Sequence, residues 1–235
     1  MTNSANSLEQ HNMTGCICNG SGYLVQNGTY KHCPACRQRA AQRAADHLSS
    51  STKEPGITWT SFVRPPASTK EQWEKLQLTI NVMRMLAESA QPDKSIYLSG
   101  PPGTGKTMLL KATWNHALLP TAMVYVPRLA DSIFTSMRAG GDDLPVLTEK
   151  LIAVPLLLID DLGTEHGGAN GFVANRLTQI IDGRYDAHRT TVVSSNLPAE
   201  KLRVKPDYER LADRILDVNR GYVIELKHPS FRRGK

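Results

Sequence analysis

The feature that most constrains this chain is a glycine-rich segment, Gly100 to Thr107, with the sequence Gly-Pro-Pro-Gly-Thr-Gly-Lys-Thr. It follows an expected strand at 95–99 and opens an expected helix at 105–118. Glycine allows backbone angles and close approaches that a side chain would block. The N–H groups at the helix start can therefore converge on an anion, assisted by the helix dipole. The pattern in this context predicts a phosphate-binding loop.

The residue types of this loop, together with a later carboxylate, suggest individual roles. We expect the Lys106 ammonium to reach the β- and γ-phosphates, and the Thr107 hydroxyl to ligate Mg²⁺. The segment 156–161, Leu-Leu-Leu-Ile-Asp-Asp, contains the carboxylate Asp160, which is expected to hold the same ion. The predicted nucleotide-contacting residues are Gly100, Pro101, Pro102, Gly103, Thr104, Gly105, Lys106, Thr107 and Asp160.

Two further polar residues follow expected buried strands. An apolar strand over 155–160 delivers Asp160 and Asp161 to its carboxyl end, where open α/β sheets bind ligands. We expect Asp161 to polarise the attacking water. The strand 190–195 is followed by Asn196, which could sense the γ-phosphate or orient that water. An ordinary strand-end turn at Asn196 is the alternative.

Strands and helices alternate from about residue 70 onward. Thr69 is suited to cap the first helix. This alternation predicts an α/β fold with a mainly parallel sheet covered by helices on both faces. A whole strand separates the loop from Asp160, so the carboxylate strand is not the next in sequence after the strand that precedes the loop. Expected strands lie at 95–99, 122–126, 155–160, 190–195 and 221–226, and expected helices at 70–90, 105–118, 128–139, 171–187 and 206–217.

Shifts in composition predict four regions. Residues 1–15 are polar and expected to be a disordered tail. Residues 16–48 form a cysteine module with a basic helix, residues 49–69 form a linker rich in Ser and Pro, and residues 70–235 form the nucleotide-binding domain. The polar N-terminus lacks the apolar centre of a signal peptide, and no stretch is apolar enough to span a membrane. A cytoplasmic location is therefore expected.

All four cysteines lie close together, as Cys16-x-Cys18 and Cys33-x-x-Cys36. Two close pairs separated by a hairpin-sized insert predict a tetrahedral Zn²⁺ site. The one-residue gap of the first pair is unusual, so His32 or His11 could replace one thiol. The alternatives are free thiols or a redox pair at Cys33 and Cys36, although a redox pair normally sits at a helix start in a larger fold. The turn signal Asn27-Gly28 lies within the insert.

Four phrases, GPPGTGKT, LLLIDDLG, TTVVSSN and ERLADRI, together resemble the AAA+ ATPases of the DnaC/DnaI helicase-loader family and the related IstB transposition helpers. The resemblance covers roughly residues 70–235. It implies a P-loop NTPase with a five-stranded sheet and no C-terminal lid, since only a short segment follows Arg214. It also implies ATP with Mg²⁺, self-association in the ATP state, binding of single-stranded DNA, and action on a DnaB-type ring helicase.

The same resemblance implies catalytic roles for three residues. Asn196 corresponds to sensor 1, and Arg214 to the arginine finger that acts on a neighbouring subunit. For Arg214 the alternative is a surface ion pair with Asp213, Asp217 or Glu209. Asp161 departs from the family, because most AAA+ proteins carry Glu there, and a shorter carboxylate implies slow, regulated hydrolysis.

Charge favours a polyanionic partner. The chain has a formal net charge of +6, which suggests nucleic acid. The stretch 31–43 carries Lys31, Arg37, Arg39 and Arg43 with no acid, and could meet DNA or an acidic protein, or could be a solvated helix face. On the helix at 128–139, Phe134 and Arg138 are candidates for DNA contact, with core packing of Phe134 equally open.

Three functions remain in competition. The first is an ATP-dependent loader that places a replicative helicase on single-stranded DNA during replication initiation. The second is an IstB-like transposase helper ATPase, and the third is an ATP-gated adaptor without significant hydrolysis. The cysteine module resembles the amino-terminal zinc module with which some DnaI-type loaders touch the helicase. It favours the first function, because transposase helpers usually have a helical amino-terminal region.

Overall fold

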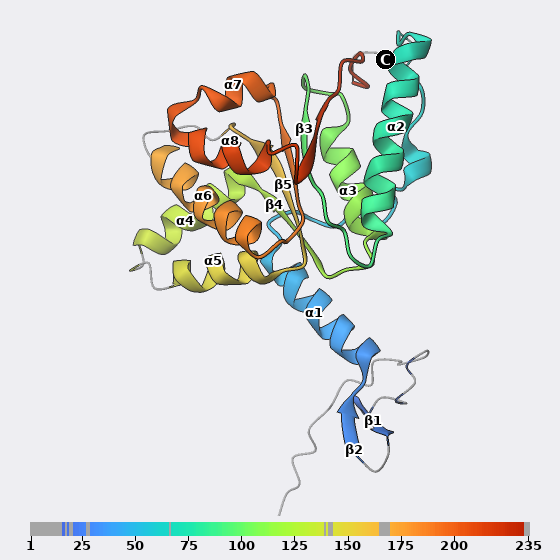
Figure 1. Ribbon diagram of the computed structural model, residues 1–235, viewed down its shortest axis with the longest axis vertical. Helices are drawn as coiled ribbons and strands as arrows, with labels where there is room; N and C mark the ends of the chain where they lie inside the picture. Colours follow the sequence, from blue (N-terminus) through green and yellow to red (C-terminus); the bar gives the residue numbers. More distant parts are fainter. Residues whose placement is uncertain are drawn as a thin grey trace, which may run out of the picture. The chain divides into compact units, whose positions relative to one another are not determined.

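The computed structural model describes residues 16, 18, 21–26, 29–65, 67–138, 140, 143–164 and 170–232. The chain divides into two compact units, residues 1–43 and 44–235, and Figure 1 shows the elements of each. The expected disorder of residues 1–15 lies outside the described residues. No helix of the described part combines the length and the apolar character that a membrane span requires.

The larger unit contains a five-stranded sheet in which every neighbouring pair is parallel. The strand order is β4-β5-β6-β3-β7, so β6 lies between the strand that precedes the glycine-rich loop and the strand that carries the carboxylates. This arrangement confirms the predicted five-stranded α/β sheet. The strands are β3 (Ser95–Ser99), β4 (Thr121–Tyr125), β5 (Leu156–Leu162), β6 (Thr191–Ser195) and β7 (Gly221–Glu225).

Helices cover both faces of this sheet, as Figure 1 shows. One face packs α2 and α3 against Leu98, Leu158 and Val192. The other face packs α4, α5, α6 and α8 against the alternate strand residues, such as Ile159 and Val193, as the two-residue period of a strand requires. The helices are α2 (Lys70–Ala87), α3 (Lys106–His116), α4 (Val126–Arg138), α5 (Asp143–Ala153), α6 (Asn170–Asp186), α7 (Ala199–Arg203) and α8 (Glu209–Ile215), with 3-10 turns η1 (Trp59–Ser61) and η2 (Pro206–Tyr208).

The start of α2 has the cap that the sequence predicts. The Thr69 hydroxyl accepts a hydrogen bond from the Gln72 N–H at 3.2 Å, and the Gln72 side chain accepts one from the Thr69 N–H at 3.0 Å. This reciprocal capping box satisfies two N–H groups that a helix start leaves without partners. The predicted first residue of this helix is confirmed.

Helix α5 is a helix that the sequence analysis did not predict. Its buried residues Leu144, Thr148 and Leu151 recur at helical spacing. Pro145 obscures the pattern, but proline is tolerated in the first helical turn, where its missing N–H breaks no bond. The helix predicted at 206–217 is instead divided into η2 and α8.

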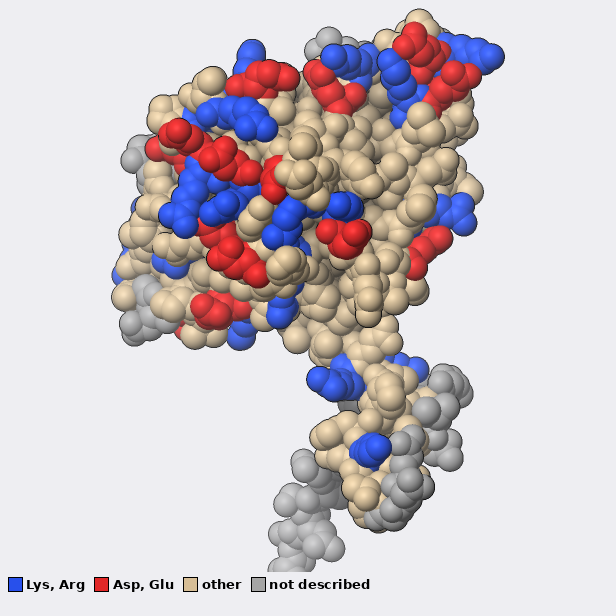
Figure 2. All heavy atoms as spheres, viewed as in Figure 1, with Lys and Arg blue, Asp and Glu red and all other residues tan. Residues whose placement is uncertain are grey.

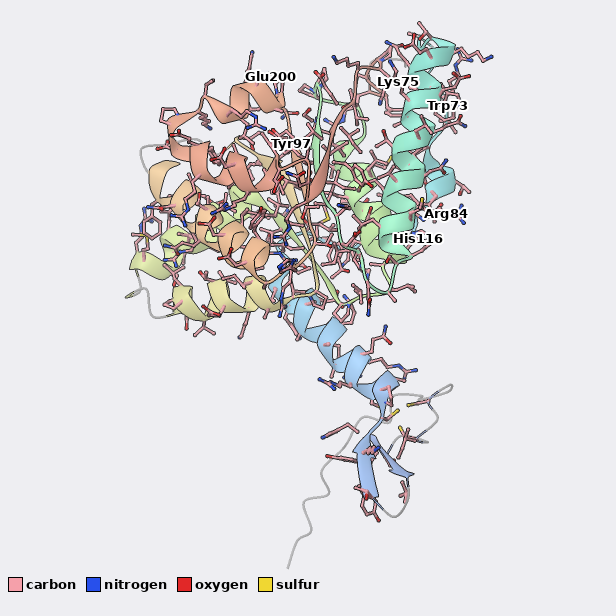
Figure 3. The ribbon with its side chains drawn as sticks, in the orientation of Figure 1. Trp73, Lys75, Arg84, Tyr97, His116 and Glu200 are labelled. Carbon is pink, nitrogen blue, oxygen red and sulfur yellow. The ribbon has the colours of Figure 1, made fainter. Side chains whose placement is uncertain are left out.

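The segment predicted as a linker, residues 49–69, packs against the larger unit. The Ser50 hydroxyl accepts a hydrogen bond from the Tyr125 N–H at 2.7 Å, and Phe62 is buried beside α3. Trp59 stacks at a tilt on His116 of α3, with ring centroids 5.3 Å apart, and Figure 3 labels His116. The Ser and Pro content suggested a linker, but the aromatic anchors hold the segment to the domain.

A buried arginine ties together the strands that carry the candidate site. Arg184 of α6 is 0% exposed, and burial lowers its pKa to about 9, so it stays charged at neutral pH. Its guanidinium donates to the carbonyl oxygens of Leu151, Ile152, Val154, Pro155 and Thr190 and to the hydroxyl of Thr191. These acceptors lie at the end of α5 and the starts of β5 and β6, which therefore have a fixed relative position.

The smaller unit is a hairpin followed by a helix. Strands β1 (Tyr23–Gln26) and β2 (Thr29–His32) pair antiparallel, and α1 (Pro34–Leu48) follows and crosses into the larger unit. The predicted turn residues Asn27 and Gly28 lie outside the described residues. The buried apolar cluster here consists of three cysteines, with Leu24, Ala35 and Cys36 packed against them.

Candidate nucleotide-binding site

The glycine-rich loop joins the end of β3 to the start of α3, as predicted. Gly105 is the N-cap of α3 and has a φ of +86°. Residues with a side chain rarely adopt this left-handed backbone conformation. The loop therefore turns directly into the helix, with the first N–H groups of α3 left for an anion.

Lys106 is held inside this loop. Its ammonium donates to the carbonyl oxygens of Gly100 at 2.7 Å and Pro101 at 3.0 Å. Burial lowers the pKa of Lys106, while the charges of Asp161 and Asp160 oppose that shift. These contacts place a cation on the concave side of the loop, where the phosphates are predicted to bind.

Thr107 and Asp160, predicted as joint ligands of Mg²⁺, are in contact. The Thr107 hydroxyl donates to Oδ1 of Asp160 at 3.2 Å, and Asp160 is 2% exposed. A hydroxyl and a carboxylate supply the oxygen ligands that Mg²⁺ prefers. The two residues are therefore positioned to share such an ion, with Thr107 facing the cavity and Asp160 behind it.

Ser194 of β6 connects the two carboxylate residues, and sequence reasoning missed it. Its hydroxyl donates to Oδ1 of Asp160 at 2.5 Å and accepts the N–H of Asp161 at 3.1 Å. Ser194 is fully buried. The signal in the sequence was the position of Ser194, two residues before Asn196 on the same strand. Its contact with Asp160 and Asp161 requires β6 to pair with β5, and the sequence does not predict that pairing.

Asp161 has an unusual backbone conformation. Its φ is +59°, and the pairing of β5 with β6 is irregular between Ile159 and Leu162. A non-glycine residue in the left-handed region costs about 1 kcal/mol, and such strain concentrates at functional sites. Burial and the neighbouring charge of Asp160 raise the pKa of Asp161, and Lys106 opposes the rise.

These residues meet at one cavity of about 360 Å³. The structure brings seven predicted site residues to its wall, namely Pro102, Gly103, Gly105, Lys106, Thr107, Asp161 and Asn196. Tyr97 of β3, labelled in Figure 3, donates from its hydroxyl to the Leu197 carbonyl at 2.7 Å and so holds the chain just after Asn196. The full lining is Ile57, Pro102, Gly103, Gly105, Lys106, Thr107, Met108, Lys111, Asp161, Asn196, Phe231 and Arg232.

Five of the lining residues were missed by sequence reasoning. Met108 and Lys111 lie on α3 just after the loop, whereas Ile57, Phe231 and Arg232 come from segments far from it in the sequence. Ile57 belongs to the segment that was predicted as a linker. The side-chain amide of Asn115 donates to the Ile57 carbonyl at 2.8 Å, which fastens this segment to α3. No local motif marks Ile57, Phe231 and Arg232, because only the packing of distant segments brings them to the cavity.

Arg214, the predicted arginine finger, does not line the cavity. Its Nε lies 3.2 Å from Oδ1 of Asp182 on α6, and its side chain remains 39% exposed. Its guanidinium also lies over the ring of Tyr185. Asp182 is thus the ion-pair partner, rather than the nearby acids of the local sequence, and it pairs with Arg210 as well.

The four cysteines of the smaller unit converge as predicted. Their sulfur atoms all lie within 4.8 Å of one another, and neighbouring Sγ atoms are separated by 3.1 to 3.4 Å. Four thiolates around a tetrahedral zinc ion lie about 3.8 Å apart, so the set fits such an ion. His32 stacks on Tyr23 instead, and His11 lies outside the described residues.

The candidate DNA contacts remain predictions. Phe134 packs against the core cluster, whereas Arg138 is exposed. Lys31, Arg37 and Arg43 of the basic stretch are exposed too. Figure 2 shows lysine and arginine interspersed with acidic residues on the visible face of the larger unit, so that face presents no single-sign patch.

Comparison with solved structures shows the same fold in replication proteins. The chain is similar to DnaI with a TM-score of 0.59 and 23% identity, over 80% of this chain and 98% of that one. It is similar to the DnaC helicase loader with a TM-score of 0.54 and 20% identity, over 73% and 97%. It is also similar to the replication initiator DnaA bound to AMPPCP and single-stranded DNA, with a TM-score of 0.56 and 20% identity, over 74% and 51%.

Sequence comparison matches about half of this chain to a known protein and most of it to a family model. A zinc metalloprotease, the ATP-dependent FtsH of Mycoplasmopsis pulmonis, is 29% identical over 126 residues, but the chain covers only 17% of that protein's length and 49% of its own. The family model of IstB-like ATP binding proteins matches residues 77–235, which include the loop, both carboxylates and Asn196. With this match and its AAA+ fold, the chain belongs to the family of IstB-like ATP-binding proteins.

Proposed function

We propose that this protein is an ATP-dependent loader that places a DnaB-type ring helicase on single-stranded DNA at the initiation of replication. The observation that carries the proposal is the likeness to DnaI and DnaC, which extends over nearly the whole of those chains. The cavity at the phosphate loop supplies the matching chemistry.

In this proposal, each site residue acts on the nucleotide. Lys106 and the N–H groups at the start of α3 bind the phosphates, while Thr107 and Asp160 hold Mg²⁺, which neutralises charge on the phosphates when bound. Asp161 and Asn196 orient the attacking water. Since Asp161 has a shorter side chain than Glu, its reach to the water is shorter, and hydrolysis is slow and depends on DNA or a partner.

Arg214 is proposed to act on the ATP of a neighbouring subunit. It stands away from the cavity of its own chain, and its partly exposed side chain is held by Asp182. A guanidinium can leave a surface ion pair at small cost and can stabilise charge on a transferring phosphoryl group. This role requires that subunits associate in the ATP state.

The smaller unit is proposed to bind one zinc ion through Cys16, Cys18, Cys33 and Cys36, and to contact the helicase. Its apolar cluster is formed mostly by those cysteines, which is too small a core for independent folding without metal. The exposed basic side chains Lys31, Arg37, Arg39 and Arg43 on β2 and α1 offer a surface for DNA or for an acidic partner surface.

The decisive experiment is a loading assay. The purified protein is mixed with the replicative helicase of its host and with circular single-stranded DNA, and helicase bound to DNA is measured with ATP, with ADP and without nucleotide. We expect loading with ATP only, no loading by Lys106→Ala, and DNA binding that weakens steeply with salt as counterions are released. Absence of any ATP-dependent complex with the helicase contradicts the proposal.

A second candidate is a transposase helper, which the IstB-like family match favours. It predicts that the protein stimulates strand transfer by a transposase while leaving helicase binding to DNA unchanged. A third, the ATP-gated adaptor, predicts ATP-dependent partner binding without DNA-stimulated hydrolysis. Measuring ATP hydrolysis with and without single-stranded DNA separates it from the other two.

A further inference from the structure

One face of the hairpin in the smaller unit carries aromatic and apolar side chains. Strands β1 and β2 pair so that Tyr23 lies opposite His32 and Val25 lies opposite Tyr30. Opposite residues of an antiparallel pair, and residues two apart on a strand, project from the same face. These four side chains therefore share one face of the hairpin, which we call the aromatic face. The rings of Tyr23 and His32 stack there at a tilt, with centroids 4.6 Å apart.

The aromatic face is open to solvent. Tyr30 is 75% exposed, Val25 is 65% exposed and Tyr23 is 47% exposed. Large apolar side chains gain free energy when they leave water. A cluster of them on one exposed face is therefore typical of a surface that binds a partner.

The opposite face of the hairpin packs on the cysteine cluster. Leu24, which alternates along β1 with residues of the aromatic face, packs against the cysteines. The Cys33 N–H donates to the Gly22 carbonyl at 2.8 Å, and the Arg37 N–H donates to the Cys33 carbonyl at 3.0 Å. The cysteine cluster thus joins the hairpin to the first turn of α1.

All charged side chains between residues 16 and 45 are basic. This stretch contains no Asp or Glu, and its cations Lys31, Arg37, Arg39 and Arg43 are all exposed. Arg39 and Arg43 are four residues apart on α1, so they lie on the same side of that helix. In the view of Figure 2, the described part of this unit likewise shows lysine and arginine but no acidic residue. Such a surface is complementary to a polyanion.

We propose that the smaller unit binds single-stranded DNA, with unpaired bases stacked on the aromatic face and phosphates bound by the basic side chains. Tyr30 is the main stacking platform, and Arg39 and Arg43 bind neighbouring phosphates. Exposed rings beside a positive surface suit a single strand, because its bases offer flat faces to aromatic rings while its backbone is anionic. A duplex keeps its bases stacked inside and offers only the phosphates.

This inference rests on the smaller unit of the proposed function, which leaves the partner of the basic side chains open between DNA and an acidic protein surface. It assigns DNA as that partner and adds the aromatic face to the contact. The nucleotide cavity is lined by residues of the larger unit. Binding of the strand by the smaller unit is therefore independent of ATP.

The test measures binding of a fluorescent oligothymidine strand to the full-length protein by anisotropy, without nucleotide. For Tyr30→Ala we expect the affinity to fall about tenfold through lost stacking, whereas Tyr30→Phe keeps the ring and should bind as wild type does. Tyr222→Ala is the matched control, because Tyr222 is an exposed tyrosine on β7 of the larger unit, and it should leave the affinity unchanged. Unchanged hydrogen exchange at the Cys33 amide shows that the hairpin of each variant is intact.

Charge and stacking have different signatures in this assay. The double variant Arg39→Ala with Arg43→Ala should weaken binding and reduce the slope of log affinity against log salt by about 1.4, since each phosphate contact on a single strand contributes about 0.7. Tyr30→Ala should leave that slope unchanged. It should also leave unchanged the affinity for a duplex of the same length, whose bases are not free to stack on a ring.

Three results overturn the inference. The first is that wild-type protein does not bind the strand without nucleotide, and the second is that Tyr30→Ala binds it as tightly as Tyr222→Ala. The third is that Tyr30→Ala loses binding to the helicase while its DNA affinity is unchanged, which makes the aromatic face a protein contact. If strand binding depends on Tyr30 but the loading assay fails, the proposed function is wrong and this inference stands.

Discussion

The hydroxyl of Ser194 accepts the backbone N–H of Asp161 at 3.1 Å. The same hydroxyl donates to Asp160, so one side chain on β6 fixes both carboxylate residues of β5. Through this link, the strained conformation of Asp161 is held by a neighbouring strand rather than by its own. The positions of Asp160 and Asp161 therefore depend on the pairing of β5 with β6.

Replacing this hydroxyl should impair hydrolysis more than binding. In Ser194→Ala, Asp160 and the Asp161 N–H each lose a buried partner, and we expect the rate of hydrolysis to fall about tenfold with a higher Mg²⁺ requirement. ATP affinity at saturating Mg²⁺ should change little. Ser195→Ala is the matched control, because its buried hydroxyl donates to the Leu162 carbonyl instead. Equal Mg²⁺ dependence in the two variants would show that Ser194 has no special role.

Lys106→Ala should abolish tight ATP binding and leave the fold intact. The substitution removes the cation at the phosphates, while the hydrogen bonds it loses join only the loop carbonyls of Gly100 and Pro101. Nucleotide affinity and thermal melting are measured side by side. If the affinity is unchanged, the assignment of the loop is wrong. An unchanged melting temperature shows that a loss of affinity comes from the site and not from unfolding.

Mixing two inactive variants should restore hydrolysis if Arg214 acts between subunits. Arg214→Ala alone should bind ATP but hydrolyse it about 10³-fold more slowly. Lys106→Ala alone should be inactive through lost binding. In the mixture, the Lys106→Ala subunit presents its intact Arg214 to the complete cavity of the other subunit, and hydrolysis should return.

Other outcomes of the mixing test have distinct meanings. A mixture that stays inactive although the variants co-assemble indicates action within one subunit. An Arg214→Ala variant with nearly normal hydrolysis indicates that Arg214 serves only its ion pair with Asp182. Arg210→Ala is the matched control, since it removes the other arginine that pairs with Asp182 and should keep most hydrolysis.

Purified protein should contain one zinc ion per chain, and a strong chelator should unfold the smaller unit alone. Zinc binding contributes directly to the folding of so small a module, whereas the larger unit has its own apolar clusters. Hydrogen exchange should therefore rise at residues 21–36, with ATP affinity unchanged. Cys33→Ser should lose the metal and His32→Ala should keep it. If protein purified under reducing conditions contains no zinc, the site is ruled out.

Removing the buried guanidinium of Arg184 should destabilise the larger unit strongly. Arg184→Met keeps an unbranched apolar side chain but removes the guanidinium, which leaves several buried carbonyl oxygens without donors, at a cost of about 3 kcal/mol or more. The free energy of unfolding is measured by denaturant titration. Arg176→Met on the same helix is the control, since Arg176 contacts the side chains of Thr148, Gln179 and Phe172. A loss equal to that of the control contradicts the role assigned to Arg184.

The amino-acid sequence determined those parts of this protein that depend on neighbours along the chain. The loop from Gly100 to Thr107, the cap at Thr69 and the clustering of four cysteines are local patterns, because residue type, backbone freedom and short spacing suffice to specify them. The apolar strand before Asp160 likewise followed from its own composition. Parallel strands end at one edge, so the meeting of Asp160 with the loop could also be predicted.

The tertiary structure decided what depends on segments far apart in the sequence. Ser194 joins Asp160 to Asp161 only because β6 pairs with β5, and Asp182 holds Arg214 only because α6 packs on α8. The segment 226–232 lies on the phosphate loop because β7 adds to the sheet beside β3. Strand order and helix packing arise from burial summed over the whole domain, and no short stretch of sequence contains that information.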